Sequence, residues 1–215
     1  LKDDYRYYEV GPTQTPIYTG AKINSSFANT FLLSNTSQGY RYNITGKVEK
    51  NSEIGNTKVN TTVAYTYGQS RDLSNGVRNS FQSNYEYNPA INPQSPDLSW
   101  SNFDLRHRIV SAVSLRLNKV DVSLYHSSQS GSPYTWVYSS NSIYGNGSNS
   151  NLVYIPKDRS EIALVDYTGN TADAQWEALD TYIKNDEYLN SRRGQYAERN
   201  GGRTPWNHVV HTKVV

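Results

Sequence analysis

Apolar and polar residues alternate along several stretches of the chain. In the stretch at 40–49, one side consists of Tyr40, Tyr42, Ile44, Gly46 and Val48. The other side consists of Arg41, Asn43, Thr45, Lys47 and Glu49. The stretch at 59–67 places on one side Val59, Thr61, Val63, Tyr65 and Tyr67. Since successive side chains of a strand point to opposite faces, this alternation predicts two strands that are apolar on one face and polar on the other.

The same alternation predicts a hairpin around Asn118-Lys119 and one more strand after Pro205. The first arm of the hairpin alternates Phe103, Leu105, Ile109, Val113, Leu115 and Leu117 with Asp104, Arg106, Arg108, Ala112 and Arg116. In the second arm, one face consists of Val120, Val122 and Leu124, and the other consists of Asp121, Ser123 and Tyr125. The last stretch places on one face Trp206, His208, Val210, Thr212 and Val214. About five strands are therefore predicted in all.

Short and long connections alternate between these strands. The short ones are the segment NSEIGN and the pair Asn118-Lys119, whereas residues 71–102 and 130–204 form the long ones. Loops of this length count against a compact soluble domain. They are typical of an outer-membrane barrel, which has short periplasmic turns and long extracellular loops.

The second long connection contains a predicted helix. The residues at helical spacing are Ala172, Trp176, Leu179 and Ile183. Asn170 or Thr171 is suited to cap the N-terminus, and Asp173 is favourable in the first turn. We expect a helix of about three to four turns that packs through its apolar side.

The composition is polar but does not indicate disorder. Only 35% of the residues are hydrophobic, yet the chain contains 19 Tyr and 4 Trp, and disordered segments are poor in aromatic residues. No apolar run reaches the roughly 18 to 20 residues of a transmembrane helix. The absence of Cys excludes a disulfide framework. Interspersed charges with a net value of +2 give no support for a nucleic-acid partner.

These patterns predict an all-β fold, namely part of a transmembrane antiparallel β-barrel with long extracellular loops, one of which contains a short α-helix. The apolar face would contact lipid and the polar face a watery lumen. A charge on the lipid face near the bilayer midplane costs about 2–4 kcal/mol. The charged residues of the first hairpin arm are therefore expected to face the lumen: Asp104, Arg106, Arg108 and Arg116.

Aromatic residues in the long loops are the candidate ligand-binding groups. The set is Tyr134, Trp136, Tyr138, Tyr144 and Tyr154, interleaved with Ser and Asn, together with Trp100 in the first loop. Such rings could hold a sugar or a peptide by stacking and hydrogen bonding. The alternative is that they mark the membrane interface or fold the loop upon itself.

No enzymatic site is predicted. His208 and His211 are an odd number of residues apart on a predicted strand, so they should face opposite sides and share no metal. Glu177 and Asp180 lie one turn apart on the predicted helix, where paired charges usually form a solvated face. We therefore predict no catalytic residues, no metal and no cofactor.

Four segments together resemble a known family. They are FDLRHRIVSAVSLRL, SGSPYTWVY, LVYIPKD and RRGQYAERNGGRTPWNHVVHTKVV. They are similar to the C-terminal barrel region of TonB-dependent outer-membrane receptors, specifically the Oar-like group, which carries a carboxypeptidase-regulatory-like domain ahead of the plug. The resemblance covers about residues 39–215, and its most specific part is the run ending at Trp206-Asn207-His208.

The resemblance implies a barrel of about 22 strands with an N-terminal plug. Residues 1–215 would be the C-terminal part of that barrel, without the plug, the earlier strands and the last strand. The implied location is the outer membrane of a Gram-negative bacterium. The implied partners are the TonB complex, through the missing N-terminal part, outer-membrane lipid, a surface lipoprotein or other outer-membrane proteins, and a peptide or oligosaccharide ligand to be imported.

Two other functions remain open from the sequence. The barrel could be an anchor whose loops bind other surface proteins, in the manner of an adhesin. Alternatively, the chain could be a soluble carbohydrate-binding β-module, since Tyr, Asn and Ser are also common in such sheets. The soluble module would fold without detergent, whereas an arc of barrel strands leaves unpaired edges and should aggregate.

Overall fold

The computed structural model describes residues 7–10, 15–18, 26, 33–76, 78–93, 95–138 and 148–215. It divides the chain into two compact units. The sheet unit consists of Gly39–Asp72, Trp100–Tyr134 and Arg203–Val215. The loop unit consists of Leu1–Gln38, Leu73–Ser99 and Thr135–Gly202.

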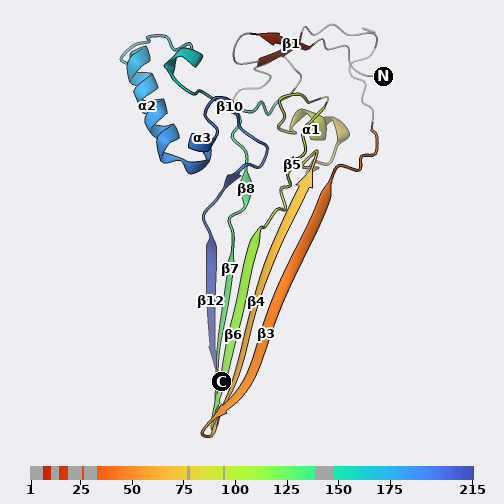
Figure 1. Cartoon of the computed structure of the whole chain (residues 1–215), viewed down its shortest axis with the longest axis vertical. Coiled ribbons are helices and arrows are strands. Elements are labelled where there is room, and N and C mark those ends of the chain that lie inside the picture. The colour runs from red at the N-terminus through yellow and green to blue at the C-terminus, as the bar shows by residue number, and fades with distance from the viewer. Residues whose placement is uncertain are drawn as a thin grey trace. The chain divides into compact units, whose positions relative to one another are not determined.

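Five long strands form the sheet unit. They are β3 (Tyr40–Ile54), β4 (Thr57–Asp72), β6 (His107–Leu117), β7 (Val120–Gln129) and β12 (Asn207–Val214). Their order across the sheet is β12-β7-β6-β4-β3, and every neighbouring pair is antiparallel (Figure 1). The predicted antiparallel β-fold of about five strands is confirmed in this sheet. Within the described chain β3 and β12 are the edges of an open sheet.

Two-residue turns connect these strands at one end of the sheet. Ile54 pairs with Thr57 across the first turn, and Leu117 pairs with Val120 across the second. The first residue of each turn has a positive φ, 61° at Gly55 and 59° at Asn118. Glycine adopts this conformation freely, and asparagine is among the few other residues that tolerate it. The predicted turn at Asn118-Lys119 is confirmed, while the connection inside NSEIGN is shorter than predicted, because β3 continues to Ile54.

Long connections join the strands at the other end of the sheet. Residues 73–106 link β4 to β6, and residues 130–206 link β7 to β12. The predicted alternation of short turns and long loops is thus confirmed. The short strands of the chain are β1 (Tyr7–Val10), β2 (Thr15–Tyr18), β5 (Ser99–Trp100), β8 (Pro133–Tyr134), β9 (Tyr154–Ile155), β10 (Gln195–Tyr196) and β11 (Gly202–Arg203).

The loop unit contains the helices, and the predicted one is present. They are α1 (Phe81–Glu86), the 3₁₀-helix η1 (Arg159–Glu161), α2 (Ala172–Asn185) and α3 (Glu187–Ser191). The side chain of Thr171 caps α2 by accepting a hydrogen bond from the N–H of Ala174. No helix in the described part of the chain is both long and apolar enough to cross a membrane.

The interior of the loop unit is small and partly polar. Its larger apolar cluster comprises Ile155, Ile183, Leu189 and Ala197, with Trp136, Leu179 and Tyr188 packed against it. Asn75 links further segments, because its side-chain oxygen accepts hydrogen bonds from Arg199 and Asn200, both at 2.7 Å. Arg199 and Asn200 are each 2% exposed. Buried polar groups need such partners, so this network fixes the loop segments in one arrangement.

Candidate functional site

The sheet has one apolar and one polar face. Strand partners directly opposite each other share a face, so the register assigns every residue to one of the two. The apolar face contains Tyr40, Tyr42, Ile44, Val48, Val59, Val63, Tyr65, Tyr67, Ile109, Val113, Leu115, Leu117, Val120, Val122, Leu124, Val210 and Val214. The predicted division into an apolar and a polar face is confirmed within β3, β4, β6, β7 and β12, whereas Phe103–Arg106 and Trp206 lie outside these strands.

Charged residues gather on the opposite, polar face. This face contains Arg41, Lys47, Glu49, Glu53, Lys58, Asp72, Arg108, Arg116, Asp121 and Lys213. Some of them pair with each other: Lys47 lies 2.7 Å from Glu49, and Arg116 donates two hydrogen bonds of 2.7 Å to Asp121. On the apolar face of these strands the charged residues are Lys50 and Arg71. The charge separation between the faces is therefore strong.

The apolar face is exposed over its whole width. Ile44 on β3 is 67% exposed, Val48 on the same strand 70%, and Val210 on β12 60%. Soluble monomers rarely expose contiguous apolar surfaces larger than a few hundred Å². The exposed apolar residues on all five strands are therefore unusual for a soluble monomer.

A row of aromatic and histidine rings crosses the apolar side at the loop end of the sheet. This aromatic strip comprises Tyr42, Tyr67, His107, Trp206, His208 and His126, with successive ring centroids 5.4 to 6.3 Å apart. Hydroxyl groups orient the imidazoles: Nδ1 of His107 lies 2.7 Å from Oη of Tyr65, and Nδ1 of His208 lies 2.7 Å from Oγ of Ser128. Rings with one apolar and one polar part are typical of a membrane–water interface.

Asp104 organises the residues just before β6. Its side chain is fully buried and accepts hydrogen bonds from the backbone N–H of Ser70 at 2.7 Å, from Nε of Arg106 at 3.3 Å and from Nη2 of Arg203. Burial and the neighbouring charge of Arg106 lower the pKa of Arg203. The Arg106 carbonyl still accepts a hydrogen bond from the Gly68 N–H at 2.9 Å. Because the next donor, the Ser70 N–H, binds the Asp104 carboxylate, the ladder ends there, and β6 begins at His107 rather than at the predicted Phe103.

Trp100 contacts two guanidinium groups. The guanidinium carbon of Arg71 lies 3.7 Å from the centre of the indole ring, and that of Arg106 lies 3.8 Å from it. Such cation–π contacts stabilise the arrangement. A role of Trp100 in ligand binding stays a prediction.

The predicted lumen-facing charges are in two places. Arg108 and Arg116 lie on the polar face of β6. Asp104 and Arg106 precede that strand and belong to the cluster around Trp100. All four therefore lie in the sheet unit, and their relation to a lumen stays a prediction.

The predicted ligand-binding aromatics are separated by the structure. Trp136 and Tyr138 pack against the two apolar clusters of the loop unit, Tyr134 forms part of β8, and Tyr144 lies outside the described residues. Trp136 also contacts the exposed Tyr182 edge to face, with ring centroids 5.9 Å apart. These contacts show that Trp136 and Tyr138 help to hold the folded loop unit together. A role of the set in ligand binding stays a prediction.

Tyr154, from the same aromatic set, is a fixed hydrogen-bond donor. Its hydroxyl group donates to Oε2 of Glu161 at 2.9 Å. Burial, followed by this hydrogen bond, raises the pKa of Tyr154 to about 12. The phenol therefore keeps its proton at neutral pH and helps to position η1.

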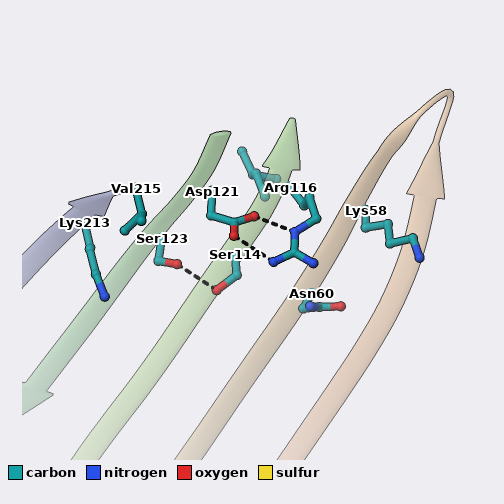
Figure 2. A pocket seen from close by; sticks show the side chains of 9 residues that line it. Lys58, Asn60, Ser114, Arg116, Asp121, Ser123, Lys213 and Val215 are labelled. Carbon is teal, nitrogen blue, oxygen red and sulfur yellow. Dashed lines mark hydrogen bonds and ion pairs between the residues drawn. The ribbon is translucent and has the colours of Figure 1, made fainter. Parts of the chain in front are cut away.

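A polar hollow lies on the polar face near the two-residue turns. Figure 2 shows side chains from four strands around it. We call this cavity of about 440 Å³ the turn-end hollow; it is lined by Lys58, Asn60, Ser114, Leu115, Arg116, Asp121, Ser123, Lys213 and Val215. The sequence pattern alone did not indicate it, because its members come together only through the register of β4, β6, β7 and β12.

The histidines and carboxylates form no metal centre in the described segments. His208 pairs with Ser128 and His211 with Tyr125, so the two imidazoles face opposite sides as predicted. Asp180 accepts hydrogen bonds from Arg193 at 2.7 Å and forms an ion pair with Lys184 at 2.6 Å. Its role is thus to join α2 to the segment after α3.

Comparison with known proteins identifies no family for this chain. No protein-family model, no curated protein and no solved structure matches the chain. The functional conclusion therefore rests on the sheet, the loops and the residues described above.

Proposed function

We propose that this chain forms part of the wall of an outer-membrane β-barrel, and that the barrel is a TonB-dependent transporter of the Oar-like group. The observation that carries the proposal is the five-stranded sheet with one exposed apolar face and one charged face. A lipid bilayer supplies the apolar environment that the first face needs. The open edges at β3 and β12 would pair with neighbouring strands of the same barrel, since unpaired edges are not tolerated in lipid.

The arrangement of turns, loops and rings supports one orientation in the membrane. Two-residue turns at one end and long connections at the other fit periplasmic turns and extracellular loops. The aromatic strip, at the loop end, would lie at the outer membrane–water interface. Arg108 and Arg116 on the polar face would then line the lumen.

In this proposal the loops capture the ligand and the barrel admits it. The polar and aromatic loop unit suits a peptide or an oligosaccharide, which both need hydrogen bonds and ring contacts. Transport would be powered by the TonB complex, acting on a part of the receptor outside residues 1–215. No covalent chemistry is involved in this function.

Spin labels on two adjacent residues of β6 test the membrane orientation. The chain contains no Cys, so Val113→Cys and Ala112→Cys place single labels on the apolar and the polar face of a strand that is paired on both sides. In outer membranes we expect the label at 113 to be accessible to oxygen dissolved in lipid, and the label at 112 to a water-soluble nickel complex. Equal access of the water-soluble reagent to both labels would show that the sheet is not in a membrane.

Uptake measurements separate a transporter from an anchor. Cells that carry the receptor should accumulate fluorescent oligopeptides or oligosaccharides, and loss of TonB should abolish this accumulation. Replacing residues 135–202 by a short Gly-Ser linker should abolish it as well, while the barrel remains in the membrane. Unchanged uptake in the absence of TonB would contradict the proposed transport function.

A further inference from the structure

We propose that the turn-end hollow binds an extended acidic peptide segment, through carboxylates that contact Lys58 and Lys213. This inference rests on the proposed function only in that the polar face must be in contact with water. It assigns a binding role to residues of the sheet that are different from the aromatic residues considered as ligand contacts.

The hollow has an excess of positive charge. Its charged lining consists of Lys58, Arg116 and Lys213, opposed by the single carboxylate of Asp121. That carboxylate is already engaged, because both of its oxygens accept hydrogen bonds from Arg116 at 2.7 Å. Lys58 has one weak contact, since Glu53 lies 3.8 Å away with its side chain 70% exposed. The two lysines are thus available for further carboxylates.

The spacing of the lysines favours an extended ligand over a small anion. Lys58 is on β4 and Lys213 on β12, and β6 and β7 lie between them. Lys58 is in register with Asp121 and Lys213 with Ser123, so the two lysines are three strands and two residues apart, or about 16 Å. Figure 2 shows the two lysines on opposite sides of the Arg116–Asp121 pair, so a single carboxylate or phosphate could not contact both. In an extended peptide, carboxylates four residues apart are about 14 Å apart, and the long lysine side chains can span the remainder.

The centre of the hollow suits a peptide backbone. Ser114 and Ser123 are direct strand partners, and their hydroxyl groups are 3.1 Å apart. Asn60 is the partner of Ser114 on the other side, and these three residues form a row in line with Lys213. Hydroxyl and amide groups can both donate to and accept from peptide groups. Lys58 lies two residues from Asn60 along β4, in register with Arg116 and Asp121. Neutral polar groups flanked by cations therefore match an acidic segment.

Peptide binding to the detergent-purified polypeptide that contains this chain tests the inference. The probe is a fluorescent peptide in which Glu and Gly alternate, and its control has Gln in place of Glu. We expect the Glu peptide to bind about tenfold more tightly, and high salt to abolish the difference. Equal binding of the two peptides would overturn the inference.

Variants assign the binding to the hollow. Lys58→Gln combined with Lys213→Gln should weaken binding of the Glu peptide about tenfold. The matched control is Lys47→Gln, which removes a lysine from the same face outside the hollow and should leave binding unchanged. Lys58→Arg combined with Lys213→Arg should retain binding, which would show that the positive charge at these two positions is required. An equal loss in Lys47→Gln would show that only general charge matters.

Competition distinguishes a peptide from a small dicarboxylate. Succinate at the same concentration of carboxylate should displace little of the Glu peptide. Full displacement by succinate would replace the inference with a small-anion site. The spin-label experiment at 112 and 113 is independent of these results, so failure of peptide binding would leave the membrane orientation intact.

Discussion

Asp104 joins distant parts of the sheet unit through one buried carboxylate. It accepts hydrogen bonds from Ser70, Arg106 and Arg203, and Arg203 is 99 residues away in the sequence. Asp104→Asn would remove the charge that compensates the two arginines and replace one acceptor by a donor. Breaking a buried ion pair in this way costs about 3 kcal/mol. Urea unfolding of the purified polypeptide should show this loss, whereas Asp121→Asn, at an exposed pair, should have a much smaller effect.

Gly131 is required because the chain passes very close to it. A Cβ atom at this position would overlap with the carbonyl group of Thr204, which belongs to the backbone and cannot turn away. Gly131→Ala should therefore destabilise the loop end of the sheet by at least about 2 kcal/mol. Gly46→Ala is the matched control, since a Cβ there meets nothing within 4 Å. Faster proteolysis near residue 131 in the first variant alone would confirm the prediction; equal resistance of both variants would contradict it.

At the level of the elements, the strands and the main helix were largely predictable from local pattern. Each strand has one apolar and one polar face, so apolar and polar residues alternate along its sequence. The helix at 172–185 shows its periodicity and its cap in the same way. The start of β6 was not predictable, because Asp104 competes for the Ser70 N–H across the sheet. The turn-end hollow depends on the register of four strands, for which no local signal exists.

The link between α2 and Arg193 predicts a dependence on pH. The hydrogen bond from Lys184, followed by that from Arg193, lowers the pKa of Asp180. A carboxyl group with a lowered pKa stabilises the folded state above its unfolded value of about 3.9. This contribution is lost as the pH falls through the lower, folded value. Asp180→Asn should therefore destabilise α2 at pH 7 and have little effect in strong acid.

Hydrogen exchange followed by mass spectrometry measures this effect on peptides from residues 172–191. Wild type and Asp180→Asn are compared at the same pH, so the intrinsic pH dependence of exchange cancels. Glu177→Gln is the control, because Glu177 lies on the same helix outside the ion pairs of the described residues. A difference between wild type and Asp180→Asn that persists unchanged at low pH would show that the ion pairs are not its cause.

For the whole molecule, the decisive property is the contrast between the two faces of the sheet. If the apolar face contacts lipid, Val63→Arg places a charge near the middle of β4 within the hydrocarbon layer, at a cost of about 2–4 kcal/mol. Thr62→Arg places the same charge one residue away on the polar face, next to Glu49, where water and an opposite charge are available. The amount of folded polypeptide in urea-washed outer membranes should fall strongly for Val63→Arg and remain unchanged for Thr62→Arg. A soluble protein whose apolar face is covered by another chain would also lose stability in Val63→Arg, but its wild type would be recovered in the soluble fraction. The variant pair and the fractionation of the wild type therefore decide together whether lipid or protein covers this face.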